Sequence, residues 1–98
     1  MYTYEVQVET TPDASEAFEA YMRRKHIPEI FATGCFADIT FEAASATRFR
    51  TRYRAHRRED LDRYLLDHAP AFRRDFLEHF PEGLKVQRDL WEARQTFG

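Results

Sequence analysis

The chain has 98 residues, and its 15 basic and 17 acidic side chains give a formal net charge of -2 at pH 7. This length predicts one domain over residues 1–98, with a single core and no room for a deep catalytic cleft of its own. The nearly balanced charge gives no electrostatic reason to expect nucleic acid or an anionic membrane as a partner. No apolar run is long enough to span a bilayer, no segment resembles a signal peptide, and Cys35 is the only cysteine, so we expect a cytoplasmic protein.

The first third of the chain combines a strand pattern with two helix patterns. Apolar and polar side chains alternate over residues 2–9, which predicts a strand with one buried and one solvated face. Apolar residues then recur at helical spacing after a Thr-Pro start, which predicts a helix over residues 12–25. Because Pro28 disfavours continuation of that helix, we expect the helix to stop before it and a short second turn to occupy residues 28–32.

The next segments predict a hairpin whose second strand carries a row of arginines. Alternation returns over residues 35–42, with Cys35 on the core-facing parity as a buried thiol and Phe36 on the open face. Small residues at 43–46 then turn the chain into the strand ATRFRTRYRAH, residues 46–56. The side chains that share the charged face of this strand are Arg48, Arg50, Arg52, Arg54 and His56.

The last part of the chain predicts a long helix and a final strand. An apolar stripe runs over residues 59–80, with a kink or restart at Pro70, and a strand follows within 84–94. The order βαββαβ is typical of the α+β ferredoxin-like fold, in which two helices cover one face of a four-stranded antiparallel sheet. In the strand order 4-1-3-2 of that fold, the arginine strand lies between the first two strands. Its acidic neighbours would then be Glu5 and Glu9 on one side and Asp38 and Glu42 on the other.

The arginine row has two interpretations. We interpret it first as a ladder of cross-strand ion pairs with these carboxylates. The alternative is that some guanidinium groups of Arg48, Arg50, Arg52 and Arg54 are unpaired and bind the carboxylate or phosphate of a small anionic molecule. RNA is a weaker candidate, because RNA-binding sheets of this topology expose aromatic side chains where this face carries charge.

His26 is the candidate for acid-base chemistry, because it lies at the predicted end of the first helix and histidine titrates near neutral pH. Its alternative role is that of a helix-terminal cation that interacts with the helix dipole. The four histidines and Cys35 lack the paired spacing of a zinc site, and the chain has no glycine-rich phosphate loop and no serine nucleophile motif. We therefore expect no metal and no cofactor.

Three segments carry a resemblance to a known family: YEVQV at 4–8, KHIPEIFATGCF at 25–36 and YLLDHAPAFRRDFLEHF at 64–80. In these segments the chain is similar to Domain of Unknown Function 4286, a family of small bacterial proteins. The resemblance implies a dimeric α/β barrel, in which the bare sheet faces of two ferredoxin-like subunits pack together. It implies no activity and no catalytic residues.

These observations lead to two functional hypotheses. The first is a homodimer that binds a small molecule or has an interaction role without catalysis. The second is a small cofactor-independent enzyme that acts on an anionic or aromatic compound at the dimer cavity. In that enzyme His26 would be the acid or base, and Arg50 or Arg52 would hold the anion.

Overall fold

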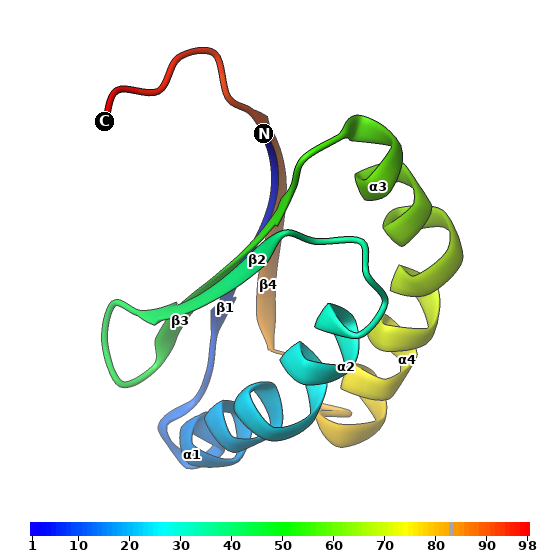
Figure 1. Ribbon diagram of the computed structural model, residues 1–98. Coiled ribbons are helices and arrows are strands. Elements are labelled where there is room, and N and C mark those ends of the chain that lie inside the picture. Colours follow the sequence, from blue (N-terminus) through cyan, green and yellow to red (C-terminus); the bar gives the residue numbers. More distant parts are fainter. Residues whose placement is uncertain (83) are drawn as a thin grey trace.

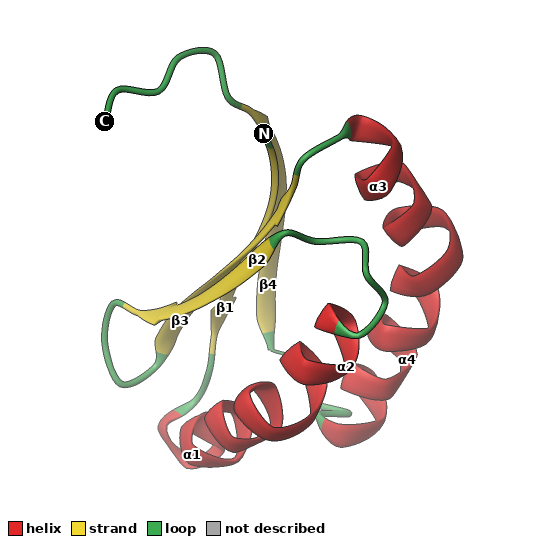
Figure 2. Cartoon of the chain, viewed as in Figure 1, coloured by secondary structure: helices red, strands yellow, loops and turns green. Residues whose placement is uncertain are grey.

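The sheet has four antiparallel strands, and the helices cover one of its faces. The computed structural model describes residues 1–82 and 84–98. The strands are β1 (Tyr2–Glu9), β2 (Asp38–Ala43), β3 (Arg48–Ala55) and β4 (Lys85–Glu92). They lie in the order β2-β3-β1-β4 (Figure 1), and Figure 2 shows that the helices leave the other face of the sheet bare. The predicted α+β ferredoxin-like topology is confirmed, with the arginine strand β3 between β1 and β2.

Two helical segments, each interrupted by a π-helical turn, form the second layer. The first comprises α1 (Pro12–Tyr21), η1 (Met22–His26) and α2 (Ile27–Phe31), and the second comprises α3 (Arg58–Arg63), η2 (Tyr64–His68) and α4 (Ala69–His79). As predicted, α1 begins at a cap: the Thr11 side-chain oxygen accepts a hydrogen bond from the Ala14 backbone N–H at 3.3 Å. No helix in the described part of the chain is long and apolar enough to cross a bilayer.

The predicted helix break at Pro28 is wrong, because a π-turn accommodates this proline. The Ile27 N–H donates to the Met22 carbonyl oxygen, which lies five residues back instead of four. In a regular α-helix a proline removes one hydrogen bond, and its ring collides with the carbonyl group four residues back. The wider turn moves that carbonyl group away from its α-helical position, so the helix continues into α2. Pro70 follows the second π-turn, η2, in the same way.

The second strand begins later than predicted, at Asp38. Gly34 has a φ of 75°, in the left-handed region that favours glycine, and it turns the chain out of the helix. Residues 35–37 then approach the sheet outside any strand, and Phe36 packs in the core with its ring centroid 4.9 Å from that of Tyr64. The prediction of Phe36 on the open face is therefore wrong, whereas Cys35 is buried as expected.

The core between the sheet and the helices consists of two clusters rich in aromatic side chains. Tyr53 and Leu61 belong to the cluster near η2, and Phe18 belongs to the cluster near the start of β4. The Phe18 ring lies 5.2 Å from that of Phe49 between centroids. Tyr53, Phe18 and Leu61 are each less than 2% exposed, so the helices are held on the sheet mainly by burial of large rings.

Strand β4 lies at one edge of the sheet and has one side toward the helices. Its register pairs Val86 with Val8 and Arg88 with Val6, so Arg88 shares the face that the helices cover. Trp91, the only tryptophan of the sequence, pairs with Thr3 and lies on the bare face, where it is 57% exposed. An arginine is thus positioned beside the core, and an aromatic ring is positioned outside it.

Candidate functional site

The arginine row of β3 forms ion pairs on the bare face, as the ladder interpretation predicted. Arg54 donates to both carboxylate oxygens of Asp38, from Nε to Oδ1 at 2.8 Å and from Nη2 to Oδ2 at 2.9 Å. This hydrogen-bonded pair is the main reason why the pKa of Asp38 lies below its usual value. Arg50 Nη2 lies 2.8 Å from Glu42 Oε1, and Arg52 Nε lies 3.3 Å from the same oxygen.

The centre of the bare face holds polar groups that the ladder leaves incompletely paired. Glu5 is only 9% exposed, and it accepts a hydrogen bond from Gln7 Nε2 at 3.1 Å and lies 3.9 Å from Arg50 Nη1. The buried Arg52 Nε has no hydrogen bond within the described residues, because its contact with Glu42 is poorly aligned. Arg48 has no carboxylate oxygen within 4.0 Å among those residues. A ligand role for the arginine row stays a prediction.

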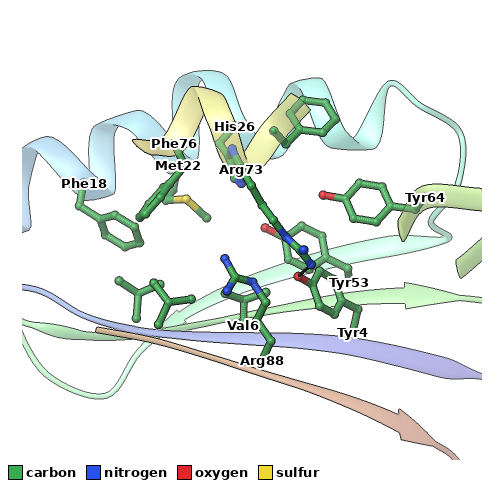
Figure 3. Close-up of a pocket in the computed structure, with 13 residues that line it drawn as sticks. Tyr4, Val6, Phe18, Met22, His26, Tyr53, Tyr64, Arg73, Phe76 and Arg88 are labelled. Atoms are coloured by element: carbon green, nitrogen blue, oxygen red, sulfur yellow. Dashed lines mark hydrogen bonds between the residues drawn. The ribbon is translucent and has the colours of Figure 1, made fainter. Parts of the chain in front are cut away.

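A second candidate site is a cavity between the sheet and the helices (Figure 3). It contains about 470 Å³ of space outside protein atoms, part of it open to solvent, and the centre of a water molecule can reach about 40 Å³. The apolar part of its wall comes from Val6, Val8, Phe18, Met22, Phe72, Phe76 and Val86. The polar part comes from Tyr4, His26, Tyr53, Tyr64, Arg73 and Arg88. An apolar wall with several hydrogen-bonding groups is the composition typical of sites for small organic molecules.

His26 lines this cavity and belongs to a hydrogen-bonded chain that ends at Asp75. The Tyr21 hydroxyl donates to Asp75 Oδ2 at 2.7 Å, and its oxygen lies 3.2 Å from His26 Nδ1. Because the Tyr21 proton is used in the bond to the carboxylate, Nδ1 of His26 must carry a proton and donate it to the Tyr21 oxygen. In the neutral ring Nε2 is then unprotonated and can accept a proton. Lys25 Nζ lies 3.1 Å from Asp75 Oδ2 and holds the carboxylate at the end of this hydrogen-bonded chain.

The electrostatics keep His26 uncharged and Asp75 ionised at neutral pH. Burial is the main cause that lowers the pKa of His26 to about 4; Lys25 and His79 add to this effect, and the charge of Asp75 opposes it. The hydrogen bond from Tyr21 is the main cause that holds the pKa of Asp75 below its usual value. The role of His26 as a helix-terminal cation is therefore wrong, because the ring is neutral and the helix continues beyond it.

Two further tyrosines present neutral hydroxyl groups to the cavity. Burial raises the pKa of Tyr64 above its usual value, and burial also raises that of Tyr53. A third hydroxyl, that of Tyr4, accepts a hydrogen bond from Arg73 Nη2 at 3.2 Å. The cavity therefore combines an apolar wall with several hydrogen-bonding groups that carry no charge at neutral pH.

The sequence grouped His26 with Arg50 or Arg52, but the structure places them on opposite sides of the sheet. His26 lines the cavity under the helices, whereas both arginines belong to the ion pairs of the bare face. Arg73 and Arg88 border the same cavity as His26 and were not predicted as site residues. The sequence signal for Arg88 was its position on the parity of Val86 and Leu90 in the last strand.

Comparison with protein families identifies the relatives of this chain. Residues 1–93 match the model of a family described as a domain of unknown function, DUF4286. The chain belongs to the DUF4286 family. No curated protein matches the sequence.

Within the described residues of this DUF4286 protein, no group of three or more histidine, cysteine or acidic side chains is placed to hold a metal ion.

Several solved structures share the fold at low sequence identity. An ethyl tert-butyl ether D (EthD) family protein from Bacillus halodurans has a TM-score of 0.69 and 15% identity, over 95% of this chain and 99% of that chain. SnoaB from Streptomyces nogalater, described as a cofactor-independent oxygenase, has a TM-score of 0.64 and 17% identity, over 97% and 94%. A dimeric ferredoxin-like protein from an uncultured marine organism has a TM-score of 0.69 and 9% identity, over 98% and 96%. At these identities the similarity shows the ferredoxin-like fold alone.

Proposed function

We propose that this DUF4286 protein is a homodimer that binds a small organic molecule in the cavity between its sheet and its helices. The observation that carries the proposal is the wall of that cavity, in which apolar side chains surround a few hydrogen-bonding groups. We favour binding over catalysis as the function, because most of the wall is apolar and can bury a ligand but offers few groups for chemistry.

In the proposed dimer, the bare sheet faces of two subunits pack together. The exposed ring of Trp91 lies on this face and supports a covering partner. One of the structures with the same fold is described as dimeric. Sedimentation equilibrium should give about twice the monomer mass of 11.7 kDa. A monomer at micromolar concentration would contradict the proposal.

A second candidate function is cofactor-independent catalysis, and the hydrogen-bonded chain from Asp75 through Tyr21 to His26 favours it. In this function Nε2 of His26 removes a proton from a molecule bound in the cavity, and Tyr21 fixes the tautomer that makes this possible. SnoaB, which shares the fold, is described as a cofactor-independent oxygenase. This second function uses the same cavity, so one set of experiments separates the two.

The binding proposal is tested by thermal shift with a panel of small aromatic and aliphatic compounds, since a ligand of the native state raises the unfolding temperature. Val86→Phe places a ring in the cavity and should abolish the shift, while Leu66→Phe adds the same ring at an exposed position and should leave it intact. Shifts that survive Val86→Phe in a folded protein would refute the cavity as the binding site. Mass spectrometry of the recovered compound then decides between binding, which leaves it unchanged, and turnover, which converts it.

A further inference from the structure

Two arginines that come from opposite layers of the fold line the cavity. Arg73 belongs to α4 and Arg88 to β4, and both line the cavity. Figure 3 shows Arg73 extending from its helix toward the sheet and Arg88 extending from its strand toward the helices. Arg73 Nη2 donates to the Tyr4 hydroxyl at 3.2 Å, which holds this guanidinium group above the sheet. The two side chains therefore reach the same cavity from the helix layer and from the sheet.

These two cations form no ion pair within the described residues. Neither Arg73 nor Arg88 has a carboxylate oxygen within 4.0 Å among residues 1–82 and 84–98. On the bare face, by contrast, Arg54 is paired with Asp38 at 2.8 Å. An anion bound by both guanidinium groups would supply the counter-charge that neither has within 4.0 Å. Both side chains are exposed, so an anion can reach them from solvent.

The surroundings of the pair favour a carboxylate that is attached to an apolar group. A guanidinium group offers paired N–H donors that match the two oxygens of a carboxylate. Behind the arginines the wall becomes apolar, with Val6, Phe76 and Val86 among its members. His26 on the same wall is uncharged near neutral pH, so it neither repels nor replaces the two cations. The centre of a water molecule reaches only about 40 Å³ of this space, so the apolar group must be small and the wall must move to admit a ring.

We propose that Arg73 and Arg88 clamp the carboxylate of a small organic acid at the cavity, while the apolar part of the acid enters it. This inference rests on the proposed function, because it names the class of ligand for the same cavity. It assigns anion binding to the side of the sheet opposite to the arginine row of β3.

The test compares benzoate with benzamide, which has the same ring and a similar shape but no charge. Binding is measured by NMR titration to the native protein and to the variants Arg73→Met, Arg88→Met and Arg74→Met. The last variant removes an equal charge from an exposed neighbour of Arg73 on the same helix. We expect benzoate to bind at least about tenfold more weakly to each of the first two variants and unchanged to the third, because a hydrogen bond to a charged group is lost.

The outcomes separate failure of this inference from failure of the proposed function. Equal affinity for benzoate and benzamide, or benzoate binding that does not respond to Arg73→Met or Arg88→Met, would refute the clamp while the cavity remains a binding site. Inorganic phosphate that binds as tightly as benzoate would refute the requirement for an apolar group. If neither ring compound binds and no compound shifts the unfolding temperature, the proposed function itself fails and the clamp fails with it.

Discussion

Acidification should destabilise this protein through His26 before it affects the carboxylates. The pKa of His26 is lowered from 6.5 to about 4 in the folded protein, so the unfolded chain takes up a proton over a range in which the folded protein does not. The stability that the neutral His26 ring contributes is therefore fully present above the pKa of His26 in the unfolded chain. It is lost as the pH decreases toward the pKa of His26 in the folded protein. A shift of this size amounts to about 3 kcal/mol in full, and about 2 kcal/mol of it is lost between about pH 7 and about pH 5.

The assay is urea denaturation at several pH values, with His26→Asn as the perturbation. Asparagine can place an N–H group near the position of Nδ1 and so keep the bond to Tyr21, but it does not titrate. The free energy of unfolding of the variant should decrease about 2 kcal/mol less than that of the native protein over the same pH range. His56→Asn is the matched control, since His56 is exposed, and it should leave the pH dependence unchanged.

The pH range distinguishes His26 from the acidic groups whose pKa is lowered in the folded protein. The pKa values of Asp75 and Asp38 lie below the usual 3.8, so the stability that these groups contribute is lost only at lower pH. An identical decrease for the native protein and His26→Asn between about pH 7 and about pH 5 would refute the burial of a neutral imidazole.

Three other predictions concern the bare face and the Tyr21 hydroxyl. If two subunits pack through their bare faces, the fluorescence of Trp91 should become less accessible to iodide as protein concentration rises, and constant quenching would contradict this packing. In urea denaturation, Arg54→Met should cost about 0.2 to 1 kcal/mol, because two hydrogen bonds to Asp38 are lost at the surface, and Arg52→Met should cost less. Tyr21→Phe should raise the pKa of the Asp75 carboxyl group, measured by NMR, because it removes the main cause of the low value; an unchanged pKa would exclude that hydrogen bond in solution.

The fold could be predicted from the sequence because its periodicities are strong. The alternation in β1 and β3 and the apolar stripes of the helices lead to the βαββαβ order, and that order leads to the observed neighbours of the arginine strand. Apolar spacing does not report a π-turn, so Pro28 looked like a helix end. Phe36 was predicted on the wrong face for a related reason, because the alternation of apolar and polar residues begins at residue 35, before the start of β2 at Asp38.

The candidate site was predictable only in part. His26 was selected for its residue type and its position near a helix end, and the structure places it at the cavity. The cavity combines side chains from three strands and both helical segments, and no single segment of sequence displays that combination. The paired arginines of β3 were predictable because cross-strand neighbours follow from strand order, whereas Arg73 and Arg88 line one cavity only because α4 and β4 both border it.

The π-turn η1 means that the position of the imidazole depends on the length of the helix as well as on its side chains. Tyr21 and His26 are five residues apart, and in a regular α-helix such residues point about 140° away from each other. Their hydrogen-bonding distance of 3.2 Å therefore depends on the additional residue that η1 contains. Deletion of one exposed residue of that turn, Arg24, would leave Tyr21 and His26 four residues apart in a regular α-helix, about 40° apart on the same face, so their contact would be kept. A return to regular α-helical turns without the loss of a residue would instead separate His26 from Tyr21.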